Sequence, residues 1–326
     1  KVAFRLVLTT PACPMKTQME NAARDAVAAL PGVSEVSVRM DSEVPKGFQL
    51  AGKQSVPGVK NIIASSSGKG GVGKSTVAVN TALALAEAGA KVGIVDCDVF
   101  GPNIPMMMGV YGLPPSAGDK IKPAMSYGVK VMSIGFLVPE EKPIIWRGPM
   151  VSGLIKQFIY DVDWGELDYL VVDLPPGTGD AQLTLAQIVP MSGAIVTVTP
   201  QPVATHDAVK GMLMFKQLEV PVLGIVENMS YFVCPCGCNH RTDIFGHGGA
   251  RKMAEEHEVR FLGEVPIDAG IREGGDQGQP IMIAAPTSHV ADAFRQVASQ
   301  VASQVSIENA KRASANLVQI TGIGVR

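Results

Sequence analysis

The chain has 326 residues, of which 46% are hydrophobic, and a formal net charge of −2 at pH 7. This length and apolar content predict a globular protein with one large domain and a smaller one, and the balanced charge gives no support to broad electrostatic binding of nucleic acid. No apolar run approaches the roughly 18 residues that a membrane span needs. We therefore expect neither nucleic acid nor membrane as a partner, and a location in the cytoplasm or in an organelle stroma or matrix.

The amino-terminal residues 1–44 predict a small α+β domain. Val2–Leu8 is an apolar, β-branched run, Pro14–Leu30 has helical spacing, and residues 36–40 alternate as in a half-buried strand. Cys13 stands at the predicted start of the helix, where the helix dipole would favour its thiolate. It is therefore either a transient metal ligand or a small buried hydrophobic residue.

Pro and Gly residues mark the border of this small domain. Residues 45–58 are rich in both and are interpreted as a linker. A large domain is predicted for residues 59–305, with a last helix from Ser288 to about Val305. Residues 306–326 have few charges and a weak pattern, so we expect a tail that is partly ordered at best. The chain starts at Lys1 without a Met, and we expect its natural start to be missing.

A phosphate loop is the clearest motif of the large domain. Residues 65–76 follow the apolar run Asn61–Ala64 and precede the Ala-rich segment Val77–Ala88, which together predict a strand, a loop and a helix. The pattern G-x-x-x-x-G-K-[ST] lets backbone N–H groups converge on phosphate oxygens, and the helix amino end adds partial positive charge. Lys74 is expected on the β- and γ-phosphates of ATP, and Ser75 on Mg²⁺. The predicted nucleotide-binding residues are Gly68, Gly70, Gly71, Val72, Gly73, Lys74, Ser75 and Thr76.

Acidic residues follow two of the predicted strands. Asp96 and Asp98 come after the apolar run Lys91–Val95, and Asp173 ends the run that begins at Leu167. Ligands of open α/β sheets collect at the carboxyl ends of the strands, so these carboxylates are expected to face nucleotide, Mg²⁺ or the attacking water. Asp173 fits the Walker B role, which holds Mg²⁺ through water. Asp96 and Asp98 could instead cap the next helix.

Strands alternate with helices along the rest of the large domain. The spacing predicts an α/β fold with a doubly wound, mostly parallel sheet of the P-loop NTPase type. Gly177, shortly after Asp173, could sense the γ-phosphate through its amide. Arg147 could be structural or could contact the cofactor, and the sequence leaves both open.

Lys69 adds a feature that the general pattern does not require. The sequence Gly-Lys-Gly-Gly-Val-Gly-Lys-Ser-Thr resembles the deviant Walker A loop of the class that contains MinD, ParA and the nitrogenase iron protein. In that class the first lysine reaches the nucleotide of the partner subunit, so the resemblance implies an ATP-dependent homodimer with Lys69 acting across it. The resemblance also assigns Asp98 to water positioning and switching, and Asn228 to the adenine edge. On its own, Lys69 would be read as an ordinary solvated lysine.

Three of the five cysteines, Cys234, Cys236 and Cys238, are crowded together. An odd number of cysteines with such a cluster is no disulfide framework, and clustered soft ligands indicate metal or redox chemistry. His240 and His247 follow closely, so a structural zinc site of three Cys and one His is an alternative to iron. Spacing by itself does not separate zinc from iron.

Longer motifs resemble the Mrp/ApbC family of iron–sulfur cluster carriers over approximately residues 59–301. Thr9–Pro14 and the turn after them resemble the carboxyl-terminal part of a small iron–sulfur assembly domain that is often fused ahead of such ATPases. The motifs of the large domain are Glu-Asn-Met-Ser-Tyr-Phe-Val-Cys-Pro, Asp-Ile-Phe-Gly-His-Gly-Gly, Asp-x-Asp-Val-Phe-Gly-Pro-Asn-Ile-Pro and Trp-Arg-Gly-Pro-Met.

The family resemblance implies a labile [4Fe–4S] cluster on the dimer axis, held by two cysteines of each subunit in C-x-x-C spacing. It also implies slow, switch-type ATP hydrolysis and transfer of the cluster from an upstream assembly scaffold to apo iron–sulfur proteins. Here the spacing is C-x-C-x-C, and Gly237 stands where the second family cysteine is expected. We favour Cys234 with Cys236 as ligands and keep Cys238 as a third candidate.

Two other functions are compatible with this sequence. A ParA/MinD-type positioning ATPase would bind DNA or membrane and predicts a basic surface or a cationic tail, for which Lys311, Arg312 and Arg326 are thin support. A small-molecule kinase or ligase would use the cysteines for structural zinc. The metal bound after anaerobic loading with iron and sulfide separates the carrier from both.

Overall fold

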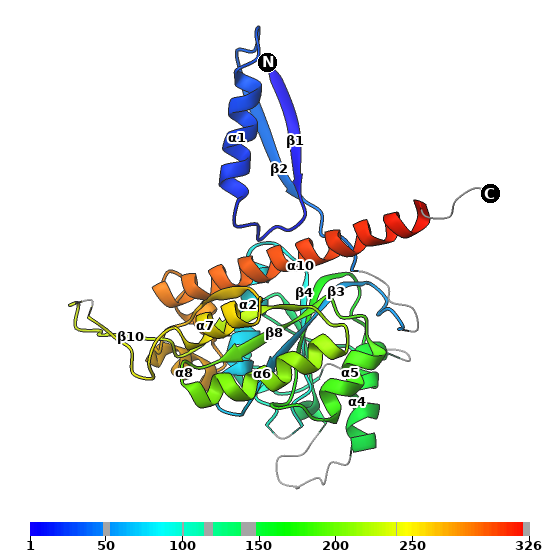
Figure 1. Ribbon diagram of the computed structural model, residues 1–326, viewed down its shortest axis with the longest axis vertical. Coiled ribbons are helices and arrows are strands. Elements are labelled where there is room, and N and C mark those ends of the chain that lie inside the picture. The colour runs from blue at the N-terminus through cyan, green and yellow to red at the C-terminus, as the bar shows by residue number, and fades with distance from the viewer. Residues whose placement is uncertain (48–52, 100, 114–119, 138–147, 239, 322–326) are drawn as a thin grey trace.

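The structure is a computed structural model that describes all residues except 48–52, 100, 114–119, 138–147, 239 and 322–326. A small amino-terminal unit stands on a larger α/β unit (Figure 1). The strands are β1 (Val2–Leu8), β2 (Val36–Ser42), β3 (Val59–Ser67), β4 (Val92–Asp96), β5 (Ala124–Ser126), β6 (Val129–Ser133), β7 (Leu167–Asp173), β8 (Gly193–Val198), β9 (Val222–Glu227), β10 (Phe232–Val233), β11 (Arg241–Thr242) and β12 (Phe261–Glu264). The helices are α1 (Lys16–Ala28), α2 (Lys74–Glu87), α3 (Ile104–Met107), α4 (Gly148–Tyr160), α5 (Asp180–Ile188), α6 (Pro202–Gln217), α7 (Gly249–Glu256), α8 (Ala269–Asp276), α9 (Ile281–Ala284) and α10 (His289–Thr321).

The small unit has the expected strand–helix–strand order. β1 and β2 pair in parallel, from Val2 opposite Val36 to Leu8 opposite Ser42, and α1 connects them. Along β1 the side chains alternate between half-buried and exposed, as in a sheet that is covered on one face. No residue of α1, all of which is described, is fully buried, so this unit has only a thin core of its own.

The small unit rests on the large one through the residues that follow β1. Leu8 is buried, and Thr10 is only 2% exposed and accepts a hydrogen bond from the hydroxyl of Tyr169 in β7 (3.1 Å). Burial raises the pKa of Tyr169 to about 12, so the hydroxyl stays neutral. The Thr9 carbonyl accepts a hydrogen bond from Ser306 of α10 (3.5 Å). The junction therefore lies against β7 and α10.

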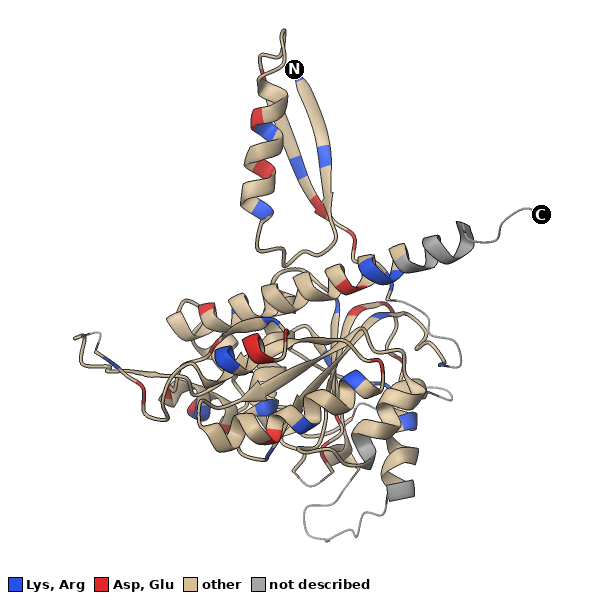
Figure 2. Ribbon diagram, in the orientation of Figure 1, with Lys and Arg blue, Asp and Glu red and all other residues tan. Residues whose placement is uncertain are grey.

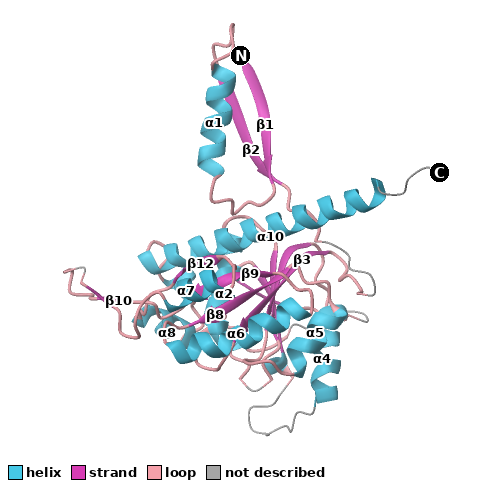
Figure 3. Cartoon of the chain, in the orientation of Figure 1, coloured by secondary structure: helices cyan, strands magenta, loops and turns pink. Residues whose placement is uncertain are grey.

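A mostly parallel sheet forms the centre of the large unit, as the sequence predicts. The strand order is β12-β9-β8-β3-β7-β4-β6-β5, and only β5 is antiparallel to its neighbour. Successive residues of β7 point to opposite layers: Tyr169 and Val171 pack in a cluster with α2 and α10, whereas Leu170 and Val172 pack with α4, α5 and α6. Helices cover both faces (Figure 3), which explains why the central strands are continuous apolar runs.

β3 lies where the strand order reverses. β7, β4, β6 and β5 lie on one side of β3, and β8, β9 and β12 lie on the other. The chain crosses from the first side to the second between β7 and β8. The strand register places Ser65 opposite Asp173, and Asp173 opposite Asp96. The phosphate loop and both acidic strand ends therefore meet at the carboxyl edge of the sheet, the place where open α/β sheets bind ligands.

The last helix is longer than the sequence indicated. α10 continues to Thr321, so the expected helix end near Val305 is wrong, whereas the expected partial order of the tail stays a prediction. No Gly or Pro occurs in residues 287–321, so nothing in the backbone ends the helix earlier. Asn309 donates a hydrogen bond to Asn61 of β3 (2.9 Å), which holds the extension against the sheet.

Parts of the predicted linker lie against β3. The N–H of Gly47 donates to the Lys60 carbonyl (2.7 Å), Asn61 donates to the Pro45 carbonyl (3.0 Å), and Val56 is buried. These contacts attach both described ends of the linker region to the large unit. The division of the chain into domains at these borders stays a prediction.

Charges of both signs are mixed along the chain. Figure 2 shows Lys and Arg interspersed with Asp and Glu on α1, α6 and α10, so none of these helices presents a purely basic face. Of the helices that the structure describes, none is both long and apolar enough to cross a membrane.

Candidate functional site

Two glycines of the phosphate loop are required by close contacts. A Cβ built on Gly68 would lie 2.3 Å from the backbone nitrogen of Ala208 in α6, so no larger residue fits there. Gly73 precedes α2 with a φ of +80°, and a Cβ on it would lie 2.1 Å from Nδ2 of Asn228. These glycines place the loop at the amino end of α2, where free N–H groups and the helix dipole favour anions.

Asn228 supports the loop from the end of β9. Its Nδ2 donates a hydrogen bond to the Val72 carbonyl (2.8 Å), and the residue is buried. The next residue, Met229, has a φ of +55°, an uncommon value for a residue other than Gly, and marks a sharp turn directly after Asn228. The sequence did not indicate this support of the loop. The predicted contact of Asn228 with adenine stays a prediction.

The ammonium group of Lys74 lies among carboxylates. Its Nζ is 2.8 Å from Oδ2 of Asp173 and 3.9 Å from Oδ2 of Asp98. The hydroxyl of Ser75 donates to the same oxygen of Asp173 (2.5 Å). Lys74 is 6% exposed and Asp173 0%, so water screens their attraction little. The residues predicted to hold phosphate and Mg²⁺ therefore form ion pairs and hydrogen bonds with one another.

Both carboxylate oxygens of Asp96 accept hydrogen bonds from other groups of the protein. Its Oδ1 accepts a hydrogen bond from the Asp98 N–H (3.1 Å), and its Oδ2 accepts from the Ile104 N–H (3.2 Å) and the Ser133 hydroxyl (3.0 Å). Ile104 is the first residue of α3, so Asp96 caps the next helix, one of the two alternatives the sequence left open. Complete burial, and then the negative charge of Asp173, raise the pKa of Asp96 to about 7.

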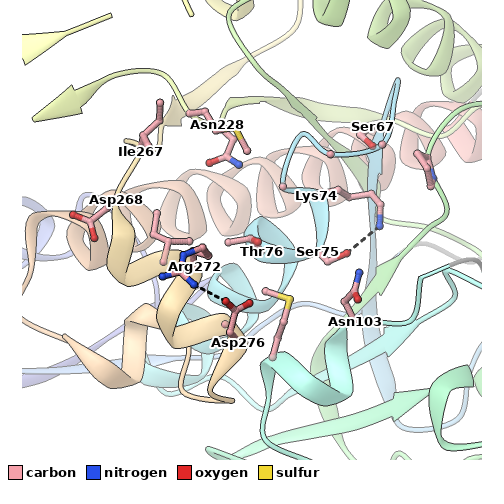
Figure 4. A pocket seen from close by; sticks show the side chains of 18 of the residues that line it. Ser67, Lys74, Ser75, Thr76, Asn103, Asn228, Ile267, Asp268, Arg272 and Asp276 are labelled. Atoms are coloured by element: carbon pink, nitrogen blue, oxygen red, sulfur yellow. Dashed lines mark hydrogen bonds and ion pairs between the residues drawn. The ribbon is translucent and has the colours of Figure 1, made fainter. Parts of the chain in front are cut away.

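A cavity of about 770 Å³ opens at this edge of the sheet. Figure 4 shows Lys74, Ser75 and Thr76 on one side of it, and Arg272 and Asp276 of α8 on another. This volume lies within the range of about 300–1,000 Å³ that is typical of small-molecule sites, and it can hold a nucleotide. Further residues of its lining are Lys69, Asp98, Asn228, Ile244, Phe245 and Ile267.

The residues around the cavity fit a nucleotide with Mg²⁺. Nothing lies within 4 Å of a Cβ built on Gly71, so the space in front of the loop is open to phosphates. Oδ1 of Asp173 is buried and, in the part of the chain that the structure describes, has no hydrogen-bond partner. Mg²⁺ in proteins usually keeps several waters, and an oxygen without a partner beside Ser75 suits the second layer of such a site.

Two further residues, Gly177 and Arg147, were considered as contacts of the nucleotide. The N–H of Gly177 donates to the Ser67 carbonyl (2.9 Å), so it would sense a γ-phosphate only after this bond opens. Pro176, just before it, does line the cavity. Arg147 lies outside the described residues.

The three clustered cysteines lie in the loop between β10 and β11. The Sγ of Cys236 is 2.9 Å from those of both Cys234 and Cys238, and the three sulfurs lie within 4.8 Å of one another. Cys236 and Cys238 are exposed, and Cys234 is partly exposed. The hydrogen bond with Cys234, and then that with Cys238, lowers the pKa of the Cys236 thiol to about 7. One side of the loop thus presents three sulfurs that can share a metal.

His247 lies apart from the cysteines. Its Nδ1 is 3.0 Å from Nη2 of Arg241, and it groups with Glu227 and Glu264. Glu227 accepts a hydrogen bond from the N–H of Ala250 (2.7 Å) and so caps α7. No histidine of the described chain joins the group of three cysteines. The histidine needed for a Cys₃His zinc site is therefore not in place.

Several residues of the site were not found from the sequence. Ile244 and Phe245 line the cavity, although they follow the cysteine motif along the chain, and Arg272 and Asp276 come from a short helix that the sequence did not predict. The signal for α8 was available, because Asp268 follows a strand and accepts from the Gly270 N–H (2.7 Å) as a helix cap.

Sequence comparison assigns the chain to a family. The profile of the NUBPL iron-transfer P-loop NTPase family matches residues 58–302, and that of an iron–sulfur cluster assembly protein matches residues 1–38. The chain belongs to the NUBPL iron-transfer P-loop NTPase family. The predicted resemblance to iron–sulfur cluster carriers, with residues of an assembly domain ahead of the ATPase, is thereby confirmed.

Relatives of this NUBPL-type chain carry consistent names. An iron–sulfur cluster carrier protein of Synechocystis is 52% identical over 311 residues, which cover 94% of this chain and 88% of the relative. That of Escherichia coli K12 is 48% identical, covering 84% and 74%. The iron–sulfur cluster transfer protein NUBPL of Dictyostelium discoideum is 50% identical, covering 79% and 80%.

Solved structures confirm the P-loop NTPase fold of this family member. A nucleotide-binding protein of Archaeoglobus fulgidus in complex with ADP is 39% identical, with a TM-score of 0.63 and coverage of 73% of this chain and 93% of that one. The cell division ATPase MinD of Pyrococcus furiosus is 25% identical, with a TM-score of 0.56 and coverage of 74% and 98%. The predicted doubly wound, deviant Walker A fold is therefore confirmed.

Proposed function

We propose that this protein is an ATP-dependent iron–sulfur cluster carrier that binds a labile [4Fe–4S] cluster and transfers it to apo-proteins. The observation that carries the proposal is the group of three sulfurs, two of them on exposed residues, on a loop that joins the wall of a nucleotide cavity. The names of the relatives support the same role, because they are called cluster carrier or cluster transfer proteins. The transfer step requires an upstream scaffold as donor and an apo iron–sulfur protein as acceptor.

The nucleotide part of the proposal assigns roles to the residues of the cavity. Lys74 binds the β- and γ-phosphates, Ser75 ligates Mg²⁺, and Asp173 holds a Mg²⁺-bound water. Asp98, which lies 3.9 Å from Lys74, positions the attacking water. Lys74 and Asp173 lie 2.8 Å apart, so the cation for the phosphates and the carboxylate for the Mg²⁺-bound water are already next to each other, and the hydrolysis is proposed to be slow and switch-type.

The cluster part of the proposal rests on sulfur chemistry. Thiolates are the ligands of iron–sulfur clusters, and the lowered pKa of Cys236 makes its thiolate available at neutral pH. Cys234 with Cys236 are the proposed ligands, with Cys238 as the third candidate. Two such pairs from a homodimer supply the four thiolates that a [4Fe–4S] cluster takes, and Lys69, which lines the cavity, is proposed to reach the nucleotide of the partner.

Anaerobic reconstitution with iron and sulfide tests this function. We expect about two iron and two sulfide per chain, the absorption of a [4Fe–4S] cluster, a dimer on size exclusion and a change in cluster release when MgATP is added. The double variant Cys234→Ala with Cys236→Ala should bind no cluster, while Cys97→Ala, which changes a buried thiol outside the group of three cysteines, should bind the cluster as wild type does. A wild-type protein that stays free of iron contradicts the proposal.

A zinc-bearing kinase or ligase on the same fold is the second candidate. Three sulfurs within 4.8 Å of one another also suit a single soft ion such as Zn²⁺. Zinc bound at one per chain after aerobic purification, together with no iron after anaerobic loading, would favour this candidate over the carrier.

A further inference from the structure

The segments that flank the cysteine loop contact or contain residues that line the nucleotide cavity. The Tyr231 carbonyl, just before β10, accepts a hydrogen bond from the N–H of Ile267 (2.6 Å), and Phe232 forms a bridge with the same residue. After β11 the chain continues directly into Ile244 and Phe245. Ile267, Ile244 and Phe245 all line the cavity. Both strands that lead to the cysteines therefore start at the wall against which a nucleotide would lie.

The side chain of Arg241 connects the two segments that flank the cysteine loop. Its guanidinium lies over the ring of Tyr231, 3.9 Å from the centroid, and its Nε donates to Oδ1 of Asp243 (3.1 Å). Nη2 is 3.5 Å from Oε2 of Glu264 and 3.0 Å from Nδ1 of His247. A planar guanidinium can hold several partners at once in fixed directions, which an ammonium group cannot. We call this set of contacts the Arg241 clamp.

Arg251 serves as a comparison for Arg241, because it makes similar contacts but does not join the two arms of the cysteine loop. It also pairs with Glu264 (3.5 Å) and also covers a ring, that of Phe261 at 4.3 Å. These contacts join α7 to β12. Arg241 differs because its partners Tyr231 and Asp243 lie on the two arms of the cysteine loop.

We propose that Arg241 is a positioning residue that transmits nucleotide occupancy to the cysteines, an inference that rests on the proposed function. Ile244 is 52% exposed and Phe245 39%, so a nucleotide in the cavity can cover apolar surface on both and shift the segment that carries them. β10 and β11 are only two residues long each, so backbone pairing holds the loop weakly. The Arg241 clamp makes segment and loop move as one body, and the sulfurs change position with the nucleotide.

Thiol labelling of the iron-free, reduced full-length protein tests this coupling. The rate at which iodoacetamide modifies Cys234, Cys236 and Cys238 is measured by mass spectrometry, with and without Mg²⁺ and adenylyl-imidodiphosphate. For wild type we expect the two rates to differ by about fivefold, the lower end of typical coupling between two sites. The nucleotide affinity of each variant is measured by calorimetry, so that a loss of coupling is not confused with a loss of binding.

The matched variants are Arg241→Gln and Arg251→Gln. We expect Arg241→Gln to bind the nucleotide with wild-type affinity while the ratio of labelling rates falls to about one, whereas Arg251→Gln keeps the wild-type ratio. Asp243→Ala removes the acceptor of the Arg241 Nε hydrogen bond and should also lower the ratio. A purely structural role would raise labelling in both states and leave the ratio unchanged.

Three results would overturn the inference. The first is a wild-type ratio in Arg241→Gln, and the second is an equal loss in Arg241→Gln and Arg251→Gln, which would assign the coupling to Glu264. The third is a wild-type protein whose labelling does not respond to nucleotide. In each case the iron content of the reconstituted wild-type protein still decides the carrier function separately.

Discussion

Replacing Lys74 by Met should destabilise the nucleotide-free protein strongly. The change removes the cation that lies 2.8 Å from Asp173 and 3.9 Å from Asp98. At an effective dielectric constant of about 20 these attractions amount to about 6 and about 4 kcal/mol. Much of this is offset because Lys74 no longer has to be desolvated. Breaking a buried pair from one side typically costs about 3–5 kcal/mol, and we expect a loss of this size in unfolding free energy.

Urea unfolding at pH 8 in the presence of EDTA measures this loss. The control is Lys60→Met, because the pair of Lys60 with Asp168 (2.9 Å) is partly exposed and should contribute about 1 kcal/mol or less. A Lys74→Met protein within about 1 kcal/mol of wild type at pH 8 would refute the reasoning.

Three further predictions concern single groups of the site. Asn228→Ala removes the hydrogen bond to Val72, and a loss of about 1 kcal/mol should weaken ATP-analogue binding about fivefold in calorimetry; unchanged affinity would argue against support of the loop by this bond. Because the pKa of Asp96 is raised to about 7, the folded protein holds a proton that the unfolded chain releases. As the pH rises from 5 to 7, this group should therefore lower the unfolding free energy by about 1.4 kcal/mol per pH unit, and the Asp96→Asn variant should lack this dependence. Cys236 should be alkylated with a midpoint near pH 7, and Cys234→Ala together with Cys238→Ala should move it toward about 8.5; a wild-type midpoint already near that value would contradict the sulfur contacts.

The centre of the fold was predictable because its strands are buried on both faces. β3, β4, β7, β8 and β9 each contain a run of apolar residues, and the polar residues that follow these runs stand out. Asp173 could be placed beside the phosphate loop from this pattern alone. Parallel strands share one carboxyl edge, so the order of the strands was not needed.

The edge of the sheet was harder to predict. β5 and β6 form a hairpin around Tyr127 and Gly128, which have φ values of +47° and +77°. Turns of this kind usually carry Asn or Gly at both positions, and Tyr gives no such signal. The alternation of Val129 and Val131 was present in the sequence, but without a turn to anchor it the hairpin went unrecognised.

Contacts between distant residues set the limit for the site itself. His247 was grouped with the cysteines because it follows them closely, but the fold turns it toward Arg241 and Glu227. Likewise, nothing in the sequence near Val72 indicates that the amide of Asn228, far along the chain, holds it in place. Local patterns identify which residues are chemically equipped, whereas their partners depend on the packing of strands and helices.

One strand, β7, reaches both the small unit and the edge of the nucleotide cavity. β7 ends at Asp173, which lies 2.8 Å from Lys74 in the wall of the nucleotide cavity. Tyr169, which contacts Thr10 of the small unit, precedes Asp173 by four positions, about 13 Å along an extended chain. A shortened protein that starts after residue 44 would expose the Tyr169 hydroxyl and the apolar residues around it. The amino-terminal unit therefore covers part of β7, and its removal is expected to disturb the strand that carries Asp173.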